Sequence, residues 1–348
     1  MSEFPTAPEQ LTVDWLSGVL GYPVEQFEVA FFSEGAGVMA WVMRVLLQTP
    51  EGRPDSIIAK FPSPSQVNRD VAHLYDMYGR EVKFYQEIAP HITVRTPACY
   101  YAAFEASTHD FVLLMEDLGD MQIGDQVEGC SLAGAKSVIA AVARFHASGW
   151  QPRRFPDLIS HNNPVQRDGM VSGFGAGWPV VLEQFGDLIP EDARAAGARI
   201  PDAVGRLLDA MCQDPVCLTH ADVRLDNIFF GDGEIALVDW QSICISAPEQ
   251  DLAYFITQSV PAAVRAQEDL VAYYHSELTR AGIDYPLDRC RERFAISALY
   301  LMCYAVVIAG TLDLGNERGQ ALGRTIIENT FGALTEIDAF ALLSHEFK

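Results

Sequence analysis

The residues with the clearest chemical potential lie in one short segment, residues 220–227, which reads His-Ala-Asp-Val-Arg-Leu-Asp-Asn. Twelve residues after Asn227, a further aspartate, Asp239, follows a short apolar run. Transfer of a phosphoryl group from ATP needs few protein groups, because positioning and charge neutralisation supply most of the rate. It needs an oxygen acceptor that orients the attacking hydroxyl, and oxygen ligands that hold Mg²⁺ against the phosphates. Asp222 suits the first task, and Asn227 and Asp239 suit the second.

The other polar residues of this segment are expected to be structural. His220 is predicted to hydrogen-bond the loop backbone, and Arg224 to pair with a carboxylate such as Asp226. Asp226 itself could face solvent or cap the loop. Two acidic groups, a histidine and an asparagine at defined spacing between apolar runs are poorly explained by solvation of a surface, so the segment favours a functional site.

The elements that must position these residues are of two kinds. Before residue 117 the pattern predicts a helix opened by a capping box at Thr6 and ending at Gly21, five strands, and one helix over residues 66–89. The strands are expected at residues 27–32, 38–47, 56–61, 98–104 and 111–115. The apolar face of the 66–89 helix is expected to carry Val71, Leu74, Tyr78, Val82 and Tyr85.

After residue 117 helical patterns dominate. Residues 131–148 form a clear amphipathic pattern, and two short apolar strands are expected at 228–230 and 235–238. Residues 151–200 are rich in glycine and proline and fit no single pattern, so an insertion particular to this protein could lie there.

His-x-Asp-x-x-x-x-Asn followed by a strand and an aspartate resembles the catalytic and metal-binding motif of protein-kinase-like phosphotransferases. The detailed form is similar to the aminoglycoside phosphotransferase and choline kinase group. Asp-Trp-Gln at 239–241 and Asp-Leu-Ala-Tyr-Phe at 251–255 resemble its ecdysteroid-kinase-like branch, although Ala221 stands where glycine is usual. The resemblance implies an α+β, two-lobed fold. A small antiparallel-sheet lobe at 1–117 would bind nucleotide, and a mainly helical lobe at 118–348 would carry catalysis and substrate binding.

The same resemblance implies roles for residues outside the segment. The residues placed near the nucleotide are Gly35, Gly37, Lys60, Glu81, Glu116 and Leu118. The two glycines fall in the phosphate-covering loop, and Lys60, paired with Glu81, would contact the α- and β-phosphates. Backbone groups around Glu116 and Leu118 would meet the adenine. Asp251 is expected to brace the catalytic loop through hydrogen bonds.

Composition narrows the possible partners and the compartment. A formal charge of −23 makes nucleic acid an unsuitable partner, because phosphate backbones are bound by lysine and arginine. Seven scattered cysteines without Cys-x-x-Cys spacing suggest reduced thiols, and the first ten residues lack the features of a signal peptide. The apolar stretch at 298–310 is shorter than the ~20 residues of a membrane helix, so we expect a buried helix there. We expect a cytoplasmic protein that binds neither nucleic acid nor membrane, and the oligomeric state stays open.

These patterns predict an ATP- and Mg²⁺-dependent phosphotransferase with a small-molecule hydroxyl as acceptor. The alternative is a catalytically inactive, nucleotide-binding regulatory module, but such proteins typically lose the base or a metal ligand, and all are present here. The apolar, glycine-rich residues 169–179 slightly favour a hydrophobic alcohol over an aminoglycoside. A choline-like acceptor would need an aromatic cage, for which Phe174, Trp178, Trp240 and Tyr304 are candidates.

Overall fold

The computed structural model describes residues 3–31, 39–312 and 316–345, and its residues fall into two compact units. Unit 1 comprises Met1–His91, Arg95–Met121 and Val238–Ser242. Unit 2 comprises Ile92–Val94, Gln122–Leu237 and Ile243–Lys348. The segment that carries Asp239 therefore belongs to unit 1, although it lies far along the chain. The domain boundary expected after residue 117 stays a prediction.

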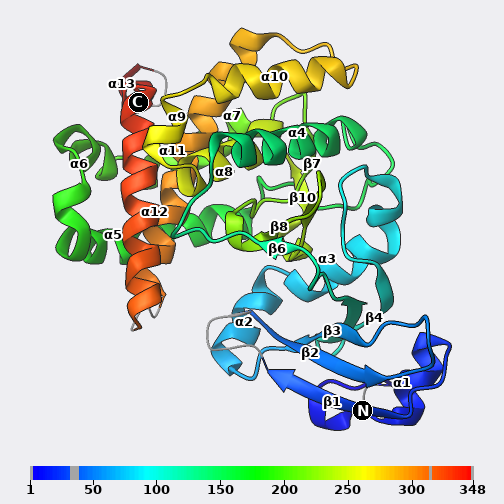
Figure 1. Ribbon diagram of the computed structural model, residues 1–348. Coiled ribbons are helices and arrows are strands. Elements are labelled where there is room, and N and C mark those ends of the chain that lie inside the picture. Colours follow the sequence, from blue (N-terminus) through cyan, green and yellow to red (C-terminus); the bar gives the residue numbers. More distant parts are fainter. Residues whose placement is uncertain (1–2, 32–38, 313–315, 346–348) are drawn as a thin grey trace. The chain divides into compact units, whose positions relative to one another are not determined.

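A five-stranded antiparallel sheet forms the centre of unit 1 (Figure 1). Its strand order is β1-β2-β3-β5-β4. The strands are β1 (Gln26–Phe31), β2 (Ala40–Gln48), β3 (Ser56–Pro62), β4 (Cys99–Glu105) and β5 (Asp110–Glu116). All five expected strands are present, which confirms the sheet-based N-terminal region.

Alternation along β3 determines which side chains reach the core and which reach the site. Successive side chains of a strand point to opposite faces of the sheet. Ile57, Ala59 and Phe61 are fully buried in a core cluster with Leu16 of helix α1 (Val13–Leu20). Lys60 must therefore point to the other face of the sheet.

The N-terminal helix starts later than the sequence pattern suggests. The capping box predicted at Thr6 is wrong, because residues Pro8–Gln10 form a separate 3₁₀ turn. Thr12 is the N-cap of α1, and its side chain accepts a hydrogen bond from the Trp15 N–H at 3.1 Å. Gly21 ends the helix with φ 73°, as expected for a glycine C-cap.

The single helix predicted over residues 66–89 is also wrong. The segment forms α2 (Gln66–Leu74) and α3 (Met77–Lys83), which continues as a π-helix over Phe84–Ile88. Asp76 lies between α2 and α3 with a left-handed φ of 50°, and this residue breaks the helical period. As a result Leu74 is 59% exposed instead of sharing the buried face of α3.

Unit 2 is mainly helical (Figure 1). Its helices are α4 (Leu132–Ser148), α5 (Pro164–Phe185), α6 (Glu191–Gly197), α7 (Ile200–Met211), α8 (Pro248–Ser259), α9 (Ala262–Arg265), α10 (Leu270–Arg280), α11 (Leu287–Thr311), α12 (Glu317–Glu336) and α13 (Phe340–His345). Its short strands are β6 (Gln122–Ile123), β7 (Cys217–Thr219), β8 (Ile228–Phe230), β9 (Ile235–Leu237) and β10 (Cys244–Ser246). These strands form the sheets β6-β8-β9 and β10-β7. The helix predicted over residues 131–148 and the two strands predicted around residue 232 are confirmed.

The glycine-rich region that fits no sequence pattern contains the long helix α5. A Cβ at Gly177 would lie 2.6 Å from the carbonyl oxygen of Val306 in α11, and one at Gly310 would lie 2.4 Å from the carbonyl oxygen of Gly177. These glycines allow the backbones of α5 and α11 to approach more closely than larger residues could. The glycine content therefore serves helix packing, which composition alone does not reveal.

Helix α11 is long and apolar enough to cross a membrane by length and composition, and it is the one described helix with this property. In its most apolar window 67% is buried inside the protein. The expectation that residues 298–310 form a buried helix is confirmed.

Candidate active site

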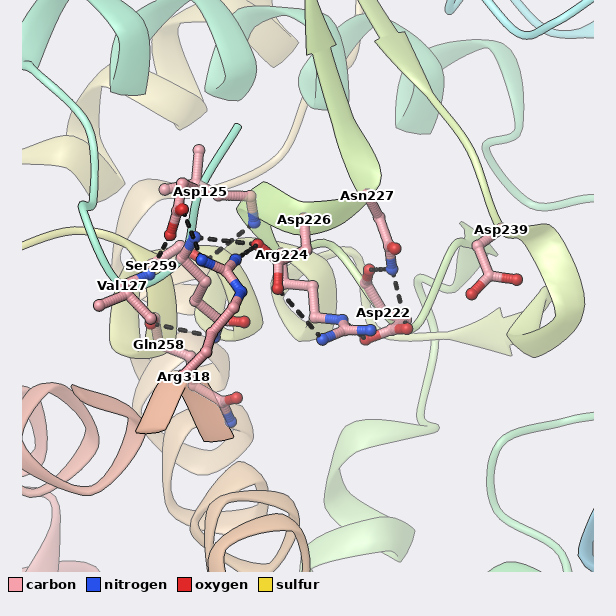
Figure 2. Close-up of polar contacts among 12 residues, drawn as sticks. Asp125, Val127, Asp222, Arg224, Asp226, Asn227, Asp239, Gln258, Ser259 and Arg318 are labelled. Atoms are coloured by element: carbon pink, nitrogen blue, oxygen red, sulfur yellow. Dashed lines mark hydrogen bonds and ion pairs between the residues drawn. The ribbon is translucent and has the colours of Figure 1, made fainter. Parts of the chain in front are cut away.

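The loop between β7 and β8 brings Asp222 and Asn227 together. The Nδ2 atom of Asn227 donates hydrogen bonds to the backbone oxygen of Asp222 at 3.0 Å and to its Oδ2 at 2.9 Å (Figure 2). A 3₁₀ turn, Leu225–Asn227, lets the chain fold back so that residues five positions apart can meet. Since the amide nitrogen is committed to Asp222, the Oδ1 of Asn227 is the atom that could serve as a ligand.

Asp251, in the first turn of α8, braces this loop from behind. Its carboxylate accepts the N–H groups of His220 and Ala221, each at 2.7 Å, and is fully buried. The bracing role predicted for Asp251 is confirmed. The Nε2 of His146 lies 3.1 Å from the same carboxylate, and its Nδ1 lies 2.7 Å from the Tyr274 hydroxyl. Because an ionised carboxylate can only accept, Nε2 donates and Nδ1 accepts from Tyr274.

The apolar pattern of residues 131–148 predicts core packing for His146, but the residue also holds the bracing aspartate. It is fully buried and lies 105 residues before Asp251 in the chain. Its place on the apolar pattern of α4 hides this contact, so no feature of the sequence separates it from an ordinary core histidine.

His220 is structural, as predicted. Its Nδ1 accepts a hydrogen bond from the Asp222 N–H at 3.2 Å, and the side chain is fully buried. This contact fixes the backbone directly before the Asp222 side chain.

Ala221 takes a backbone conformation that favours glycine. Its φ is 63°, in the left-handed region, where a Cβ costs roughly 1–2 kcal/mol. The glycine usual at this position would avoid that cost. Alanine is retained here together with two strong hydrogen bonds from its own and the preceding N–H to Asp251.

We expect Ala221→Gly to raise the free energy of unfolding by roughly 0.5–1 kcal/mol, because relief of the left-handed strain exceeds the added entropy of the unfolded chain. Chemical denaturation measures this change. In Ala140→Gly, in the middle of α4, the same substitution should lower the free energy of unfolding by about 0.5–1 kcal/mol. Equal destabilisation by both changes would contradict the strain at Ala221.

We expect Asp251→Asn to lower the free energy of unfolding by roughly 2–3 kcal/mol and to reduce turnover, because an amide supplies one acceptor oxygen where two N–H groups need one each. Denaturation and steady-state kinetics measure the two effects. A matched change at a surface aspartate, Asp232→Asn in the β8–β9 turn, should alter neither. Unchanged stability in Asp251→Asn would rule out the bracing role.

Arg224 connects Asp222 to Asp226, as predicted for a structural arginine. Its Nε lies 3.3 Å from Asp222 Oδ1, and its Nη1 lies 3.7 Å from Asp226 Oδ2. Asp226 Oδ1 also accepts the N–H of Gln126 at 3.0 Å, so this aspartate caps the loop. The charge of Asp222 is thereby partly offset within its own loop.

Arg318, near the start of α12, extends this set of charges. Its Nη1 donates to Asp125 at 2.7 Å, and its Nη2 lies 3.6 Å from Asp226 Oδ1 (Figure 2). The hydrogen bond from Arg318 holds the pKa of Asp125 below its ordinary value. No short-range pattern in the sequence predicts this contact, because Asp125, Asp226 and Arg318 are dispersed along the chain.

A second set of charged residues lies within unit 1. The Nζ of Lys60 donates to the two carboxylate oxygens of Glu81 at 2.8 and 2.7 Å, and to Asp239 Oδ1 at 2.9 Å. The side chains of Lys60 and Glu81 are 5% and 1% exposed, and that of Asp239 is 25% exposed. Burial alone would lower the pKa of Lys60, but the Asp239 and Glu81 carboxylates raise it above its ordinary value. Lys60 is therefore a buried cation with all three donors engaged.

The segment 238–242 holds Asp239 against this pair. Trp240 is fully buried and stacks on Phe84, with ring centroids 4.0 Å apart and planes 6° apart. Gln241 Nε2 donates to Asp239 Oδ2 at 3.3 Å, and the Trp240 N–H bonds to Glu81. In the Asp-Trp-Gln sequence, Asp239 thus supplies the carboxylate, Trp240 fixes the segment by packing on Phe84, and Gln241 holds the carboxylate by a hydrogen bond.

Of the four rings considered for an aromatic cage around a choline-like acceptor, two are buried. Trp240 is buried in unit 1 against Phe84. Phe174 is 1% exposed and stacks on Trp178 at 5.4 Å. Trp178 and Tyr304, the other two candidate rings, are partly exposed.

The expected adenine-binding positions lie at the end of β5. The Glu116 carboxylate is bound by Arg95 Nη2 at 2.6 Å and by the Ala98 N–H at 2.9 Å, so it fixes the chain. Leu118 is 6% exposed, and its carbonyl accepts the N–H of Met121 at 2.8 Å. Gly35 and Gly37 lie outside the described residues. The nucleotide roles of these positions stay predictions.

The antiparallel sheet, the helical second unit and the two polar clusters define a protein of the protein-kinase-like fold. The model of the ecdysteroid kinase-like family matches residues 34–283, well over half of the chain. The chain belongs to the ecdysteroid kinase-like family. The resemblance inferred from residues 220–227 and 239–241 is confirmed.

Solved structures of the same fold are similar to this chain at low sequence identity. A choline kinase from Cryptosporidium parvum has a TM-score of 0.58 at 11% identity and covers 99% of this chain and 97% of its own. The GDP complex of a mutant aminoglycoside 2′-phosphotransferase-IIIa has 0.53 at 14%, covering 96% and 97%. A Plasmodium vivax ethanolamine kinase has 0.50 at 11%, covering 90% and 83%. Comparison with curated proteins finds no match.

Proposed function

We propose that the protein transfers the γ-phosphoryl group of ATP to a hydroxyl of a small molecule. The observation that carries this proposal is the buried cluster of Lys60, Glu81 and Asp239. Burial of charged groups is costly, and buried charged clusters with perturbed pKa values are concentrated at functional sites. Membership of a kinase-like family supports the same reaction.

Asp222 is proposed to orient the acceptor hydroxyl and to take its proton. As the hydroxyl oxygen bonds to the γ-phosphorus, the bond between that phosphorus and the β–γ bridging oxygen breaks, ADP leaves, and the proton passes to the Asp222 carboxylate. Asn227 Nδ2 and the backbone of the braced loop hold the carboxylate in place for this task. Arg224, 3.3 Å from the carboxylate, offsets part of the repulsion between Asp222 and an approaching phosphate.

Asn227 and Asp239 are the proposed Mg²⁺ ligands. Both offer hard oxygen atoms, and the Asn227 Oδ1 is left for this purpose by the two bonds of its nitrogen to Asp222. Among the residues that the structure describes, no three His, Cys, Asp or Glu side chains form a ready-made metal site. That suits Mg²⁺, which typically takes one or two protein ligands beside phosphate and water oxygens. The bound ion would neutralise phosphate charge.

Lys60, fixed by Glu81, is proposed to position the α- and β-phosphates, with the loop containing Gly35 and Gly37 covering them. Backbone groups at Glu116 and Leu118 are proposed to meet the base. The side-chain bonds of Glu116 to Arg95 and Ala98 support this, because they fix the backbone of the segment. The Glu116 N–H donates to the Ala98 carbonyl at 2.8 Å, so the carbonyl is the Glu116 backbone group proposed to meet the base.

A hydrophobic alcohol is the proposed acceptor, in preference to an aminoglycoside. A polycation would need several unpaired carboxylates in one place. Beside α5, however, Asp187 pairs with Arg324 at 3.0 Å, and Asp209 pairs with Arg167. These two carboxylates are thus partly neutralised.

A cytoplasmic location is also proposed. All seven cysteines are free thiols, and four of them are buried. A reducing compartment suits such a set.

Substrate-dependent release of ADP tests the function directly. The purified protein with Mg²⁺ should release ADP when given 4-phenylbutan-1-ol or another apolar alcohol, and less when given kanamycin, choline or ethanolamine. Parallel reactions with GTP show whether ATP or GTP is the preferred phosphoryl donor. Bound ATP with no turnover on any acceptor would favour the inactive regulatory module instead.

A further inference from the structure

Taking Asp222 as the group that orients the acceptor, as proposed above, we propose that Tyr304 is a specificity-determining residue whose ring contacts the acceptor body. The acceptor class that it selects is an uncharged alcohol with an apolar ring or chain. Tyr304 lies on α11, and all the residues that support this proposal belong to unit 2.

Tyr254 links Asp222 to the tyrosines of α11. Its hydroxyl hydrogen-bonds the Asp222 carboxylate, and its side chain is 2% exposed. Burial, and then the Asp222 charge, raise the pKa of this hydroxyl well above its ordinary value, so it stays a neutral donor. The Tyr254 ring packs edge-on against Tyr304, with centroids 5.8 Å apart. A hydroxyl presented to Asp222 would therefore lie beside these two rings.

Tyr304 is the partly exposed member of a ring cluster formed by His161, Tyr254, Tyr300 and Tyr304. The other three rings are buried, with Tyr300 at 0% and His161 at 5% exposure. Gln166 of α5 fixes the cluster, because its Nε2 donates at 2.9 Å to the hydroxyls of both Tyr300 and Tyr304. Of these rings, Tyr304 is thus the one placed to touch a ligand, and its position is held firmly.

The chemistry of the ring cluster selects a neutral acceptor. Its members are phenols and an imidazole held by the Gln166 carboxamide, and the carboxylate beside them, Asp222, is already paired with Arg224 at 3.3 Å. A cation–π cage needs several accessible ring faces, but one face of Tyr304 is stacked on His161, with ring centroids 6.3 Å apart, and the other three rings are buried. An apolar surface against the ring of Tyr304 is the favourable partner.

Binding of 4-phenylbutan-1-ol to the full-length protein, measured by ligand-observed NMR titration, tests this assignment without requiring turnover. We expect Tyr304→Ala to weaken binding by about tenfold or more, because the contact area of an aromatic ring is lost. Tyr273→Ala is the matched control, since Tyr273 is a partly exposed tyrosine elsewhere in unit 2. Tyr300→Phe removes the other hydroxyl that Gln166 binds. Both controls should stay within about twofold of the wild type.

Equal weakening by Tyr304→Ala and Tyr300→Phe would overturn the assignment, because loss of the hydrogen-bond network would then explain both. So would tighter binding of choline or kanamycin than of 4-phenylbutan-1-ol, or no binding of the alcohol to the wild type. Release of ADP is measured separately on the same variants. Binding that depends on Tyr304 without any ADP release would support the contact and count against the proposed reaction. ADP release that is unchanged in Tyr304→Ala would support the reaction and count against the contact.

Discussion

Asp222→Asn is expected to reduce phosphoryl transfer by ~10²–10⁴-fold while nucleotide affinity stays nearly unchanged. An amide has the size of the carboxylate and can still accept the hydrogen bond from Asn227 Nδ2, so the loop keeps its form. It cannot take the proton of the attacking hydroxyl. ADP release with the best acceptor, together with equilibrium binding of ATP, separates the two effects.

Asp226→Asn is the matched control for this change. It is the same substitution four residues later in the same loop, at a side chain that caps Gln126 and faces Arg224 and Arg318. The amide can still accept the Gln126 N–H, and the lost ion pairs are long and partly exposed, so we expect less than a tenfold loss of turnover, about 1 kcal/mol or less. Near-normal turnover in Asp222→Asn, or equal losses in both variants, would remove Asp222 from its proposed role.

The sequence predicted the parts of the site that depend on short-range spacing. Asp222 and Asn227 lie within one loop, so their approach requires only a turn. The five strands could be predicted because alternation of apolar residues follows the two faces of a sheet. Lys60 and Glu81 are 21 residues apart, and here the resemblance to a known family supplied what spacing alone could not.

The contacts that the sequence did not reveal depend on tertiary packing. His146 and Asp251 are 105 residues apart, and Tyr254 and Tyr304 meet only because α8 and α11 lie side by side. The break at Asp76 is similar in kind, because a left-handed residue interrupts a run whose apolar spacing still looks helical. Composition alone favours a substrate surface for the glycines of α5. In the structure, Gly177 instead allows close packing of α5 against α11.

Lys60→Met is expected to lower the free energy of unfolding by roughly 3–5 kcal/mol, because it leaves Glu81 buried without its counter-ion. The same change should reduce kcat/KM for ATP by about 10²-fold, since a positioned donor to the phosphates is lost. Chemical denaturation and steady-state kinetics measure the two effects. Lys83→Met, on the same unit, removes a lysine whose contact to Glu87 is 3.9 Å and exposed, and should change stability by less than about 0.5 kcal/mol.

A second variant separates the structural from the functional effect of Lys60. In Lys60→Met/Glu81→Met neither member of the buried pair is charged, and replacement of a whole pair by apolar side chains is often neutral or stabilising. We therefore expect the double variant to regain most of the lost stability while kcat/KM for ATP stays low. Recovery of ATP use along with stability would mean that the pair only supports the fold. Persistent loss of ATP use in a stable protein would mean that Lys60 acts on the nucleotide.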